Sequence, residues 1–104
     1  MPAYIAVEIA IHDPTTYERY KGLAPPSIGM YGGRYLVRGG TTEALEGDWD
    51  PERFVILEFP TAEAARRWWN SPEYAEAKAL RQKSAHTQML LIDGPPLDPR
   101  PSGA

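Results

Sequence analysis

The stretch RFVILEF, residues 53–59, decides the fold because it is apolar on both faces of the strand that it predicts. Side chains alternate between the two faces of a strand. One face carries three apolar side chains and the other carries two: Val55, Leu57 and Phe59 on the first, Phe54 and Ile56 on the second. A one-sided antiparallel sheet normally has polar residues on its open face. A sheet that contains this strand therefore needs cover on both faces.

Three other stretches predict strands. Residues 4–11 alternate between strongly apolar and more polar side chains. Residues 34–38, RYLVR, form a short run between two Gly-Gly pairs. Residues 87–92 end in a segment that is apolar on both faces, like residues 53–59. The chain therefore supplies four strands, and two of them are apolar on both sides.

Helix signals lie between the first and second strands. Asp13-Pro14 predicts a helix start, with Asp13 as the N-cap and Pro14 at the first helical position, where its missing N–H costs nothing. Pro25-Pro26 removes two backbone donors. We therefore expect the helix to end or bend sharply there, with a second short helical piece over residues 27–31.

Similar signals follow the third strand. Thr61 can cap a helix over residues 62–70. Ser71-Pro72 then repeats the combination of a cap and a proline, and it predicts a further helical stretch over residues 73–83.

These elements follow the order β-α-β-β-α-β, which is the ferredoxin-like arrangement of the α+β class. We expect one domain over residues 1–94, with an antiparallel sheet and the helices on one of its faces. Residues 95–104 are rich in proline and predict an extended arm. Because a monomer would expose the second apolar face of the sheet, we expect a homodimer in which two sheets pack face to face. The alternative is a monomer with an apolar sheet face.

Composition limits the partners that we expect. The net charge of −3 gives no electrostatic reason to bind nucleic acid or an anionic membrane. The chain has no cysteine, which excludes thiolate chemistry and suits a reducing cytoplasm. No run reaches the roughly 18 apolar residues of a membrane span. We therefore expect a cytoplasmic protein that binds neither nucleic acid nor membrane.

Strand order also predicts which polar residues meet. We expect the order 4-1-3-2, with the first strand parallel to the third, so that His12, Arg34, Glu58 and His86 converge at one edge. His12 and Glu58 are then candidate catalytic residues, because a histidine and a carboxylate can act as acid and base. The alternative is that both histidines are ordinary surface residues. No HxH or HxxxH spacing is present, so we expect no metal.

The two arginines of RYLVR lie four residues apart, and we expect both on the same face of the strand. A cross-strand ion pair with Glu58 is the simplest role for Arg34. Arg38 lies beside Gly39-Gly40 and has two open alternatives. It pairs with an acidic residue of the following loop, or it holds a carboxylate or phosphate of a ligand through two parallel hydrogen bonds.

Aromatic residues supply the rest of the candidate ligand site. Trp69 and Tyr74 flank the interruption at Ser71-Pro72, where an irregular helical wall can leave a pocket. Tyr20 lies on the first predicted helix. We expect four residues to bind a small molecule: Tyr20, Arg38, Trp69 and Tyr74. The alternative is that the aromatic side chains fill the core.

Several motifs together resemble domain-of-unknown-function family 1330 (DUF1330). They are IHDPTTYERY, YGGRYLVRGG, LEGDW and FVILEFPTAEAARRWWNSPEY, followed by the closing apolar strand, and the resemblance covers about residues 3–94. This family resembles a branch of the dimeric α+β barrel superfamily, which implies the ferredoxin-like fold and a sheet-to-sheet dimer. Its relatives include antibiotic-biosynthesis monooxygenases, chlorite dismutase-like haem proteins and muconolactone isomerase-like enzymes. The resemblance supplies no catalytic residues and no evident haem ligand, so we expect no cofactor.

The sequence thus predicts a homodimer that binds a small anionic or aromatic molecule between the sheet and the helices. If it is an enzyme, proton abstraction or cofactor-free oxygenation of an activated aromatic compound suits such a site, with His12 or Glu58 as base. The alternative is a non-catalytic ligand sensor or an accessory module that binds a partner protein.

Overall fold

The computed structural model describes residues 1–94, and the predicted arm, residues 95–104, lies outside the described residues. The order β-α-β-β-α-β is confirmed, with the second helical region divided into two helices. The elements are β1 (Ala3–Ile11), α1 (Pro14–Met30), β2 (Arg34–Arg38), β3 (Arg53–Phe59), α2 (Ala62–Trp69), α3 (Pro72–Ser84) and β4 (Ala85–Asp93). No helix within residues 1–94 is long and apolar enough to cross a membrane.

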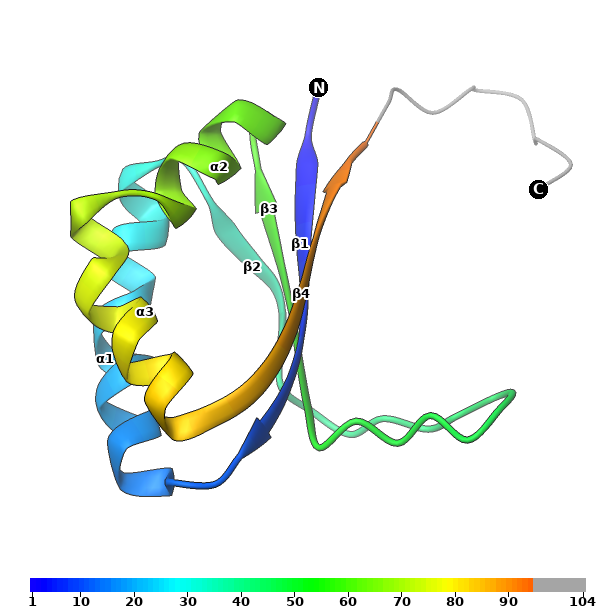
Figure 1. The fold of residues 1–104 in the computed structure, drawn as a ribbon. Helices are drawn as coiled ribbons and strands as arrows, with labels where there is room; N and C mark the ends of the chain where they lie inside the picture. The colour runs from blue at the N-terminus through cyan, green and yellow to red at the C-terminus, as the bar shows by residue number, and fades with distance from the viewer. Residues whose placement is uncertain (95–104) are drawn as a thin grey trace, which may run out of the picture.

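The sheet has the predicted strand order, β2-β3-β1-β4, and the helices cover one of its faces (Figure 1). All neighbouring strands are antiparallel, so the expectation that the first strand runs parallel to the third is wrong. Tyr4 pairs with Glu58, and Ile9 pairs with Arg53. The reason is that helix α1 returns the chain, so that β2 runs in the same direction as β1. The loop after β2 then reverses the chain into β3.

The core lies between the sheet and the helices. β1 and β3 contribute Ile5, Val7, Ile9, Val55, Leu57 and Phe59, all of them buried. Trp68 of α2 lies at the centre of an aromatic cluster, with its ring 4.0 Å from that of Tyr74 and 5.4 Å from that of Phe59. These three side chains are also buried, and large aromatic side chains bury more apolar area than any others.

Helix α1 continues through Pro25 and Pro26 to Met30, so the separate helical piece expected after the prolines does not form. Packing holds the last turns in place. The buried Ser27 accepts a hydrogen bond from the indole N–H of Trp68 at 3.1 Å, and its own hydroxyl donates to the carbonyl of Ala24 at 2.7 Å. The tertiary contacts of this segment therefore outweigh the helix-breaking effect of the prolines.

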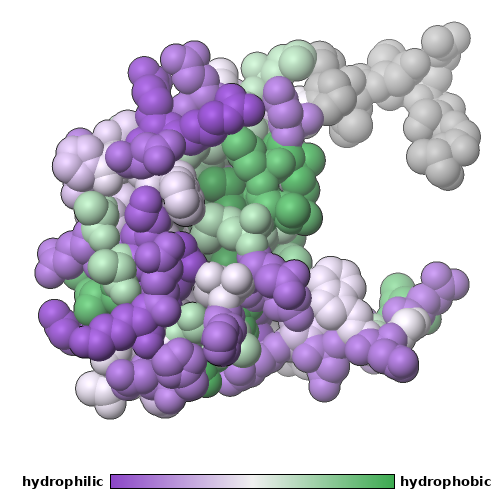
Figure 2. All heavy atoms as spheres, in the orientation of Figure 1, coloured by the Kyte–Doolittle hydropathy of each residue, from purple (hydrophilic) through white to green (hydrophobic). Residues whose placement is uncertain are grey.

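The face of the sheet that points away from the helices carries both apolar and charged side chains, and we call it the open face. Its apolar side chains are Ala6, Val37, Phe54, Ile56, Leu90 and Ile92. Leu90 is 66% exposed and Ile92 is 47% exposed. Figure 2 shows hydrophobic surface over the C-terminal half of β4. The predicted second apolar face is therefore present.

The loop between β2 and β3 extends from the sheet on the side of the open face (Figure 1). Trp49 from this loop donates its indole N–H to a carboxylate oxygen of Glu8 at 3.3 Å. Its ring meets that of Phe54 edge-on at 5.6 Å. The base of the loop is thereby fixed against the open face.

Candidate functional site

The four residues expected to converge form two separate pairs instead. Arg34 and Glu58 form an ion pair at 2.7 Å on the open face, near the start of β1. The rings of His12 and His86 lie 5.7 Å apart at the end of β1. The predicted convergence is wrong because β3 runs antiparallel to β1, which carries Glu58 to the opposite end of the sheet. The predicted role of Arg34 as an ion-pair partner of Glu58 is confirmed.

The histidine pair is exposed to solvent. The neighbouring Asp13 accepts hydrogen bonds from the side chain and the backbone of Thr16, and these bonds hold the pKa of its carboxyl below the usual value. Within residues 1–94 no three histidine or carboxylate side chains are grouped to hold a metal ion. Within the described residues, neither histidine ring forms a hydrogen bond to a carboxylate, although Glu8, Asp50 and Glu52 line the same surface pocket as His86.

A β-bulge separates the directions of the two arginines of β2. Arg34 and Tyr35 pair in regular register with Glu58 and Leu57, but the register shifts at Leu36, and Arg38 then lies opposite Val55. Leu57 and Val55 are core residues that face the helices. Tyr35 and Arg38 therefore share the helix side, while Arg34 lies on the open face. The expectation that both arginines share one face is wrong because of this bulge.

Arg38 contributes to a small cavity between α1 and the sheet, which we call the tyrosine–arginine cavity. Its volume is about 10 Å³, which is room for about one water molecule. Seven residues line it: Tyr17, Tyr20, Lys21, Tyr35, Arg38, Arg53 and Val55. The lining thus includes three cationic side chains and three tyrosines, and none of these seven residues is acidic.

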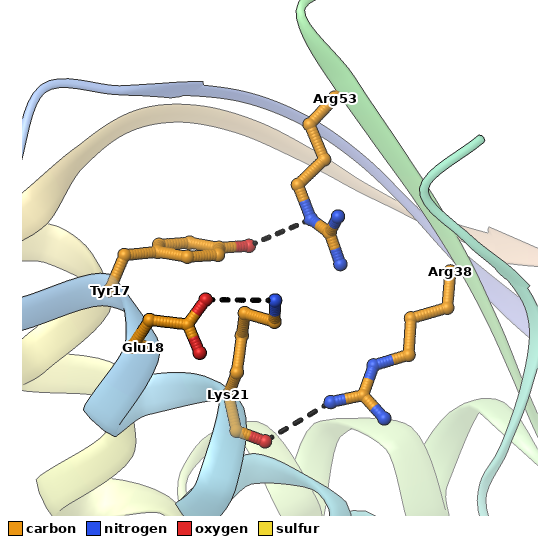
Figure 3. A network of polar contacts seen from close by, with 5 residues as sticks. All are labelled: Tyr17, Glu18, Lys21, Arg38 and Arg53. Atoms are coloured by element: carbon orange, nitrogen blue, oxygen red, sulfur yellow. Dashed lines mark hydrogen bonds and ion pairs between the residues drawn. The ribbon is translucent and has the colours of Figure 1, made fainter. Parts of the chain in front are cut away.

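Each cation of the cavity has a defined contact (Figure 3). Arg53 donates from Nε to the hydroxyl of Tyr17 at 3.2 Å. Arg38 donates from Nη2 to the backbone carbonyl of Lys21 at 3.1 Å, and its guanidinium lies 4.6 Å from the ring centre of Tyr35. Lys21 forms an ion pair with Glu18 at 3.1 Å. In the described part of the chain, neither guanidinium group has a carboxylate partner.

The tyrosine hydroxyls remain protonated at neutral pH. Burial raises the pKa of Tyr20 well above the usual value for tyrosine, and the neighbouring hydroxyl of Tyr74 raises it further. Burial also raises the pKa of Tyr17 and Tyr35, although Arg53 and Arg38 partly offset the shifts. Neutral hydroxyls can form hydrogen bonds to a bound anion. They are unsuited to act as bases near pH 7.

A third arginine lies behind the cavity. Arg81 of α3 is only 2% exposed, and its Nε donates to the hydroxyl of Tyr74 at 3.2 Å. Its Nη1 donates to the hydroxyl of Thr87. Both partners are neutral, so this buried cation adds positive charge to the interior close to Tyr20.

Sequence reasoning missed Arg53 and Arg81, although a signal for each was present. Arg53 is in phase with Val55 on the apolar face of its strand. Arg81 is in phase with Tyr74 and Ala77 on the buried face of its helix. Arginine is almost never fully buried in a protein unless it is paired. An arginine in phase with the apolar residues of a strand or helix therefore indicates a polar partner inside the protein.

The four residues of the predicted ligand site do not lie in one cavity. Tyr20 and Arg38 line the tyrosine–arginine cavity, and the fully buried Tyr74 lies behind Tyr20. Trp69 lines a second, more apolar cavity of about 240 Å³ between α2 and the sheet. Lys78 covers the ring of Trp69 at 3.8 Å. The pocket expected beside the helix interruption exists, but it is separate from Arg38.

A family model described as a domain of unknown function (DUF1330) matches residues 2–95. The chain belongs to this family. A comparison with curated protein sequences gave no match.

Solved structures share the fold. A protein of unknown function from Rhodopseudomonas palustris aligns with a TM-score of 0.74 at 21% identity, over 94% of this chain and 84% of that one. A dimeric ferredoxin-like protein of unknown function from Jannaschia sp. CCS1 aligns with a TM-score of 0.68 at 11% identity, over 90% and 100%. SnoaB, a cofactor-independent oxygenase from Streptomyces nogalater, aligns with a TM-score of 0.65 at 15% identity, over 95% and 98%. At these identities the likeness establishes the ferredoxin-like fold alone.

Proposed function

We propose that this protein is a homodimer that binds a small organic anion in the tyrosine–arginine cavity. The observation that carries the proposal is the charge of the cavity lining, where Arg38 and Arg53 face a space that no acidic residue lines. Guanidinium groups bind carboxylates through paired, charge-assisted hydrogen bonds. The hydroxyls of Tyr17 and Tyr20 supply further hydrogen-bonding groups at the same place.

The size of the cavity limits what enters it. A volume of about 10 Å³ accepts about one oxygen atom of a ligand. The remainder of the ligand lies at the mouth, beside Arg38, which is exposed. A carboxylate or phenolate on an aromatic ring fits this arrangement, because its ring can stack on the Tyr35–Arg38 pair while one oxygen points inward.

The open face supports the homodimer. Leaving a large aliphatic side chain in water forgoes about 1.5–3 kcal/mol relative to full burial. Leu90 and Ile92 are both exposed in the single chain. A second sheet packed against this face buries them, and the similar protein from Jannaschia sp. CCS1 is described as dimeric.

The cavity favours binding over proton abstraction. None of its lining residues is a histidine or a carboxylate. Glu58 is paired with Arg34 at the other end of the sheet, so it is no longer our candidate base. His12 lies at the same end of the sheet as Arg53 but does not line the cavity. A ligand sensor or carrier needs only the anion site, whereas proton abstraction also needs a base, for which His12 remains the candidate.

Calorimetric titration with benzoate tests the proposal, and benzamide serves as an uncharged ligand of similar shape. We expect saturable binding of benzoate and none of benzamide. Replacing Arg38 by alanine is expected to weaken benzoate binding about tenfold or more, the loss typical of a charge-assisted hydrogen bond. Arg34→Ala is the matched control, because it removes the same side chain from the same strand but on the open face. Equal affinities for benzoate and benzamide, or equal losses in both variants, contradict the proposal.

A further inference from the structure

Two irregularities of the chain meet at Arg38. The first is the β-bulge at Leu36, which turns Arg38 toward the helices. The second is Pro25, which lies inside α1. Arg38 bridges them, because its guanidinium reaches from β2 to the backbone of α1.

The bridging contact follows from the chemistry of proline. In an α-helix the N–H of each residue donates to the carbonyl four residues earlier, so the residue at position 25 would normally donate to Lys21. Pro25 has no N–H, and its ring crowds the carbonyl of Lys21 away from the helix axis. Arg38 donates to that same carbonyl at 3.1 Å. The carbonyl left free by Pro25 is therefore the anchor of Arg38.

We propose that Pro25 is a positioning residue for the anion site: it frees the carbonyl of Lys21 so that this carbonyl holds the guanidinium of Arg38 over the tyrosine–arginine cavity. The inference rests on the proposed function, because it assigns Pro25 a role in anion binding. An arginine side chain loses rotational freedom when it binds a ligand. Holding Arg38 in place before the anion arrives removes part of that cost.

The neighbouring proline provides a matched control. Pro26 frees the carbonyl of Gly22 in the same way, but no side chain within residues 1–94 donates to that carbonyl. Both prolines lie in the same helix and both lower its intrinsic stability. The two positions therefore differ in their connection to Arg38.

The test compares Pro25→Ala with Pro26→Ala in thermal unfolding and in calorimetric titration with benzoate. Either change restores an intrahelical hydrogen bond, so both variants should melt higher, by about 5 °C or more. We expect only Pro25→Ala to weaken benzoate binding, by about two- to tenfold, the range of one hydrogen bond. Stability and affinity thus change in opposite directions at Pro25, which a merely structural role would not produce.

Two further measurements test the link between Pro25 and Arg38 by other readouts. In the Arg38→Ala background, Pro25→Ala should leave the residual affinity unchanged, because the guanidinium through which Pro25 acts is gone. In the ligand-free protein, NMR relaxation should show greater motion of the Arg38 Nε–H group in Pro25→Ala than in Pro26→Ala.

The outcomes separate the inference from the proposed function. If the wild type binds benzoate and Arg38→Ala weakens binding, but Pro25→Ala binds as the wild type does, the inference is wrong and the proposed function stands. Unchanged motion of the Arg38 side chain in Pro25→Ala also overturns the inference. If the wild type shows no saturable benzoate binding, the proposed function and the inference fall together.

Discussion

Arg34 and Arg38 lie four residues apart on one short strand and point to opposite faces of the sheet. Arg34 pairs with Glu58 on the open face, whereas Arg38 donates to the carbonyl of Lys21 on the helix side. A single bulge at Leu36 produces the difference. One arginine is thereby used in a surface ion pair, and the other keeps its charge available at the cavity.

Removing Arg34 is expected to have a small effect on stability. The Arg34 side chain is 70% exposed, and exposed ion pairs contribute about 0.2–1 kcal/mol. Arg34→Ala should therefore lower the free energy of unfolding by no more than about 1 kcal/mol, and the loss should shrink at high salt. Urea unfolding at low and high salt measures it. A larger loss that persists at high salt would show that the ion pair stabilises the protein by more than an exposed, salt-screened contact can.

A charge placed on the open face is expected to dissociate the proposed homodimer. Ile56 lies on β3 near the middle of this face, opposite Ala6 and Val37. Ile56→Asp should raise the dimer dissociation constant by about a hundredfold or more, because a buried carboxylate without a partner is strongly unfavourable. Sedimentation velocity gives the assembly state.

The control for that prediction is Leu23→Glu. Leu23 is 40% exposed on α1, away from the open face, so this variant should remain dimeric. If Ile56→Asp stays dimeric as well, the subunits do not associate through the open face.

Stability should fall at alkaline pH because burial raises the pKa of the tyrosines that line the cavity. The pKa of Tyr20 is raised in the folded protein above the value of 10.0 expected for an exposed tyrosine. The contribution of the Tyr20 hydroxyl to the free energy of unfolding is therefore complete below pH 10, and it is lost as the pH rises above that value. The slope is at most about 1.4 kcal/mol per pH unit for one group.

Tyr20→Phe isolates this contribution. Urea unfolding of the wild type and the variant between pH 8 and roughly pH 11 should give curves that converge, because the variant lacks the group whose ionisation destabilises the wild type. Parallel curves would mean that the hydroxyl of Tyr20 ionises as readily in the folded chain as in the unfolded one.

The junction between α2 and α3 depends on the buried hydroxyl of Ser71. This hydroxyl donates to the carbonyl of Trp68 at 2.7 Å and accepts from the backbone N–H of Tyr74 at 3.1 Å. Ser71→Ala should lower the free energy of unfolding by about 1–2 kcal/mol, since it removes an N-cap. Ser71→Thr keeps the hydroxyl and serves as the control. An alanine variant as stable as the wild type would show that solvent replaces both bonds.

Much of the fold could be predicted because local signals and packing agree. The bounds of β2 follow from the Gly-rich turns on either side, and the bounds of β3 follow from the alternation of its side chains between turns that contain proline. The helix caps Asp13, Thr61 and Ser71 follow from the capping side chains themselves. The second apolar face followed from RFVILEF, because a strand alternates strictly. These features depend on neighbours in sequence.

The site was harder to predict because it depends on strand direction and register. Taking β3 as parallel to β1 placed Glu58 at the wrong end of the sheet. With the correct direction, His12 and His86 share their end with Arg38 and Arg53. The bulge at Leu36 has no Gly or Pro to mark it, so the turn of Arg38 toward the helices had no local signal.

Native mass spectrometry of gently purified protein tests the central claim most directly, because it reports assembly and bound ligand together. The account predicts a mass of twice the chain, carrying a small adduct that Arg34→Ala retains and Arg38→Ala loses. A monomer, or an adduct that Arg38→Ala keeps in full, would contradict it.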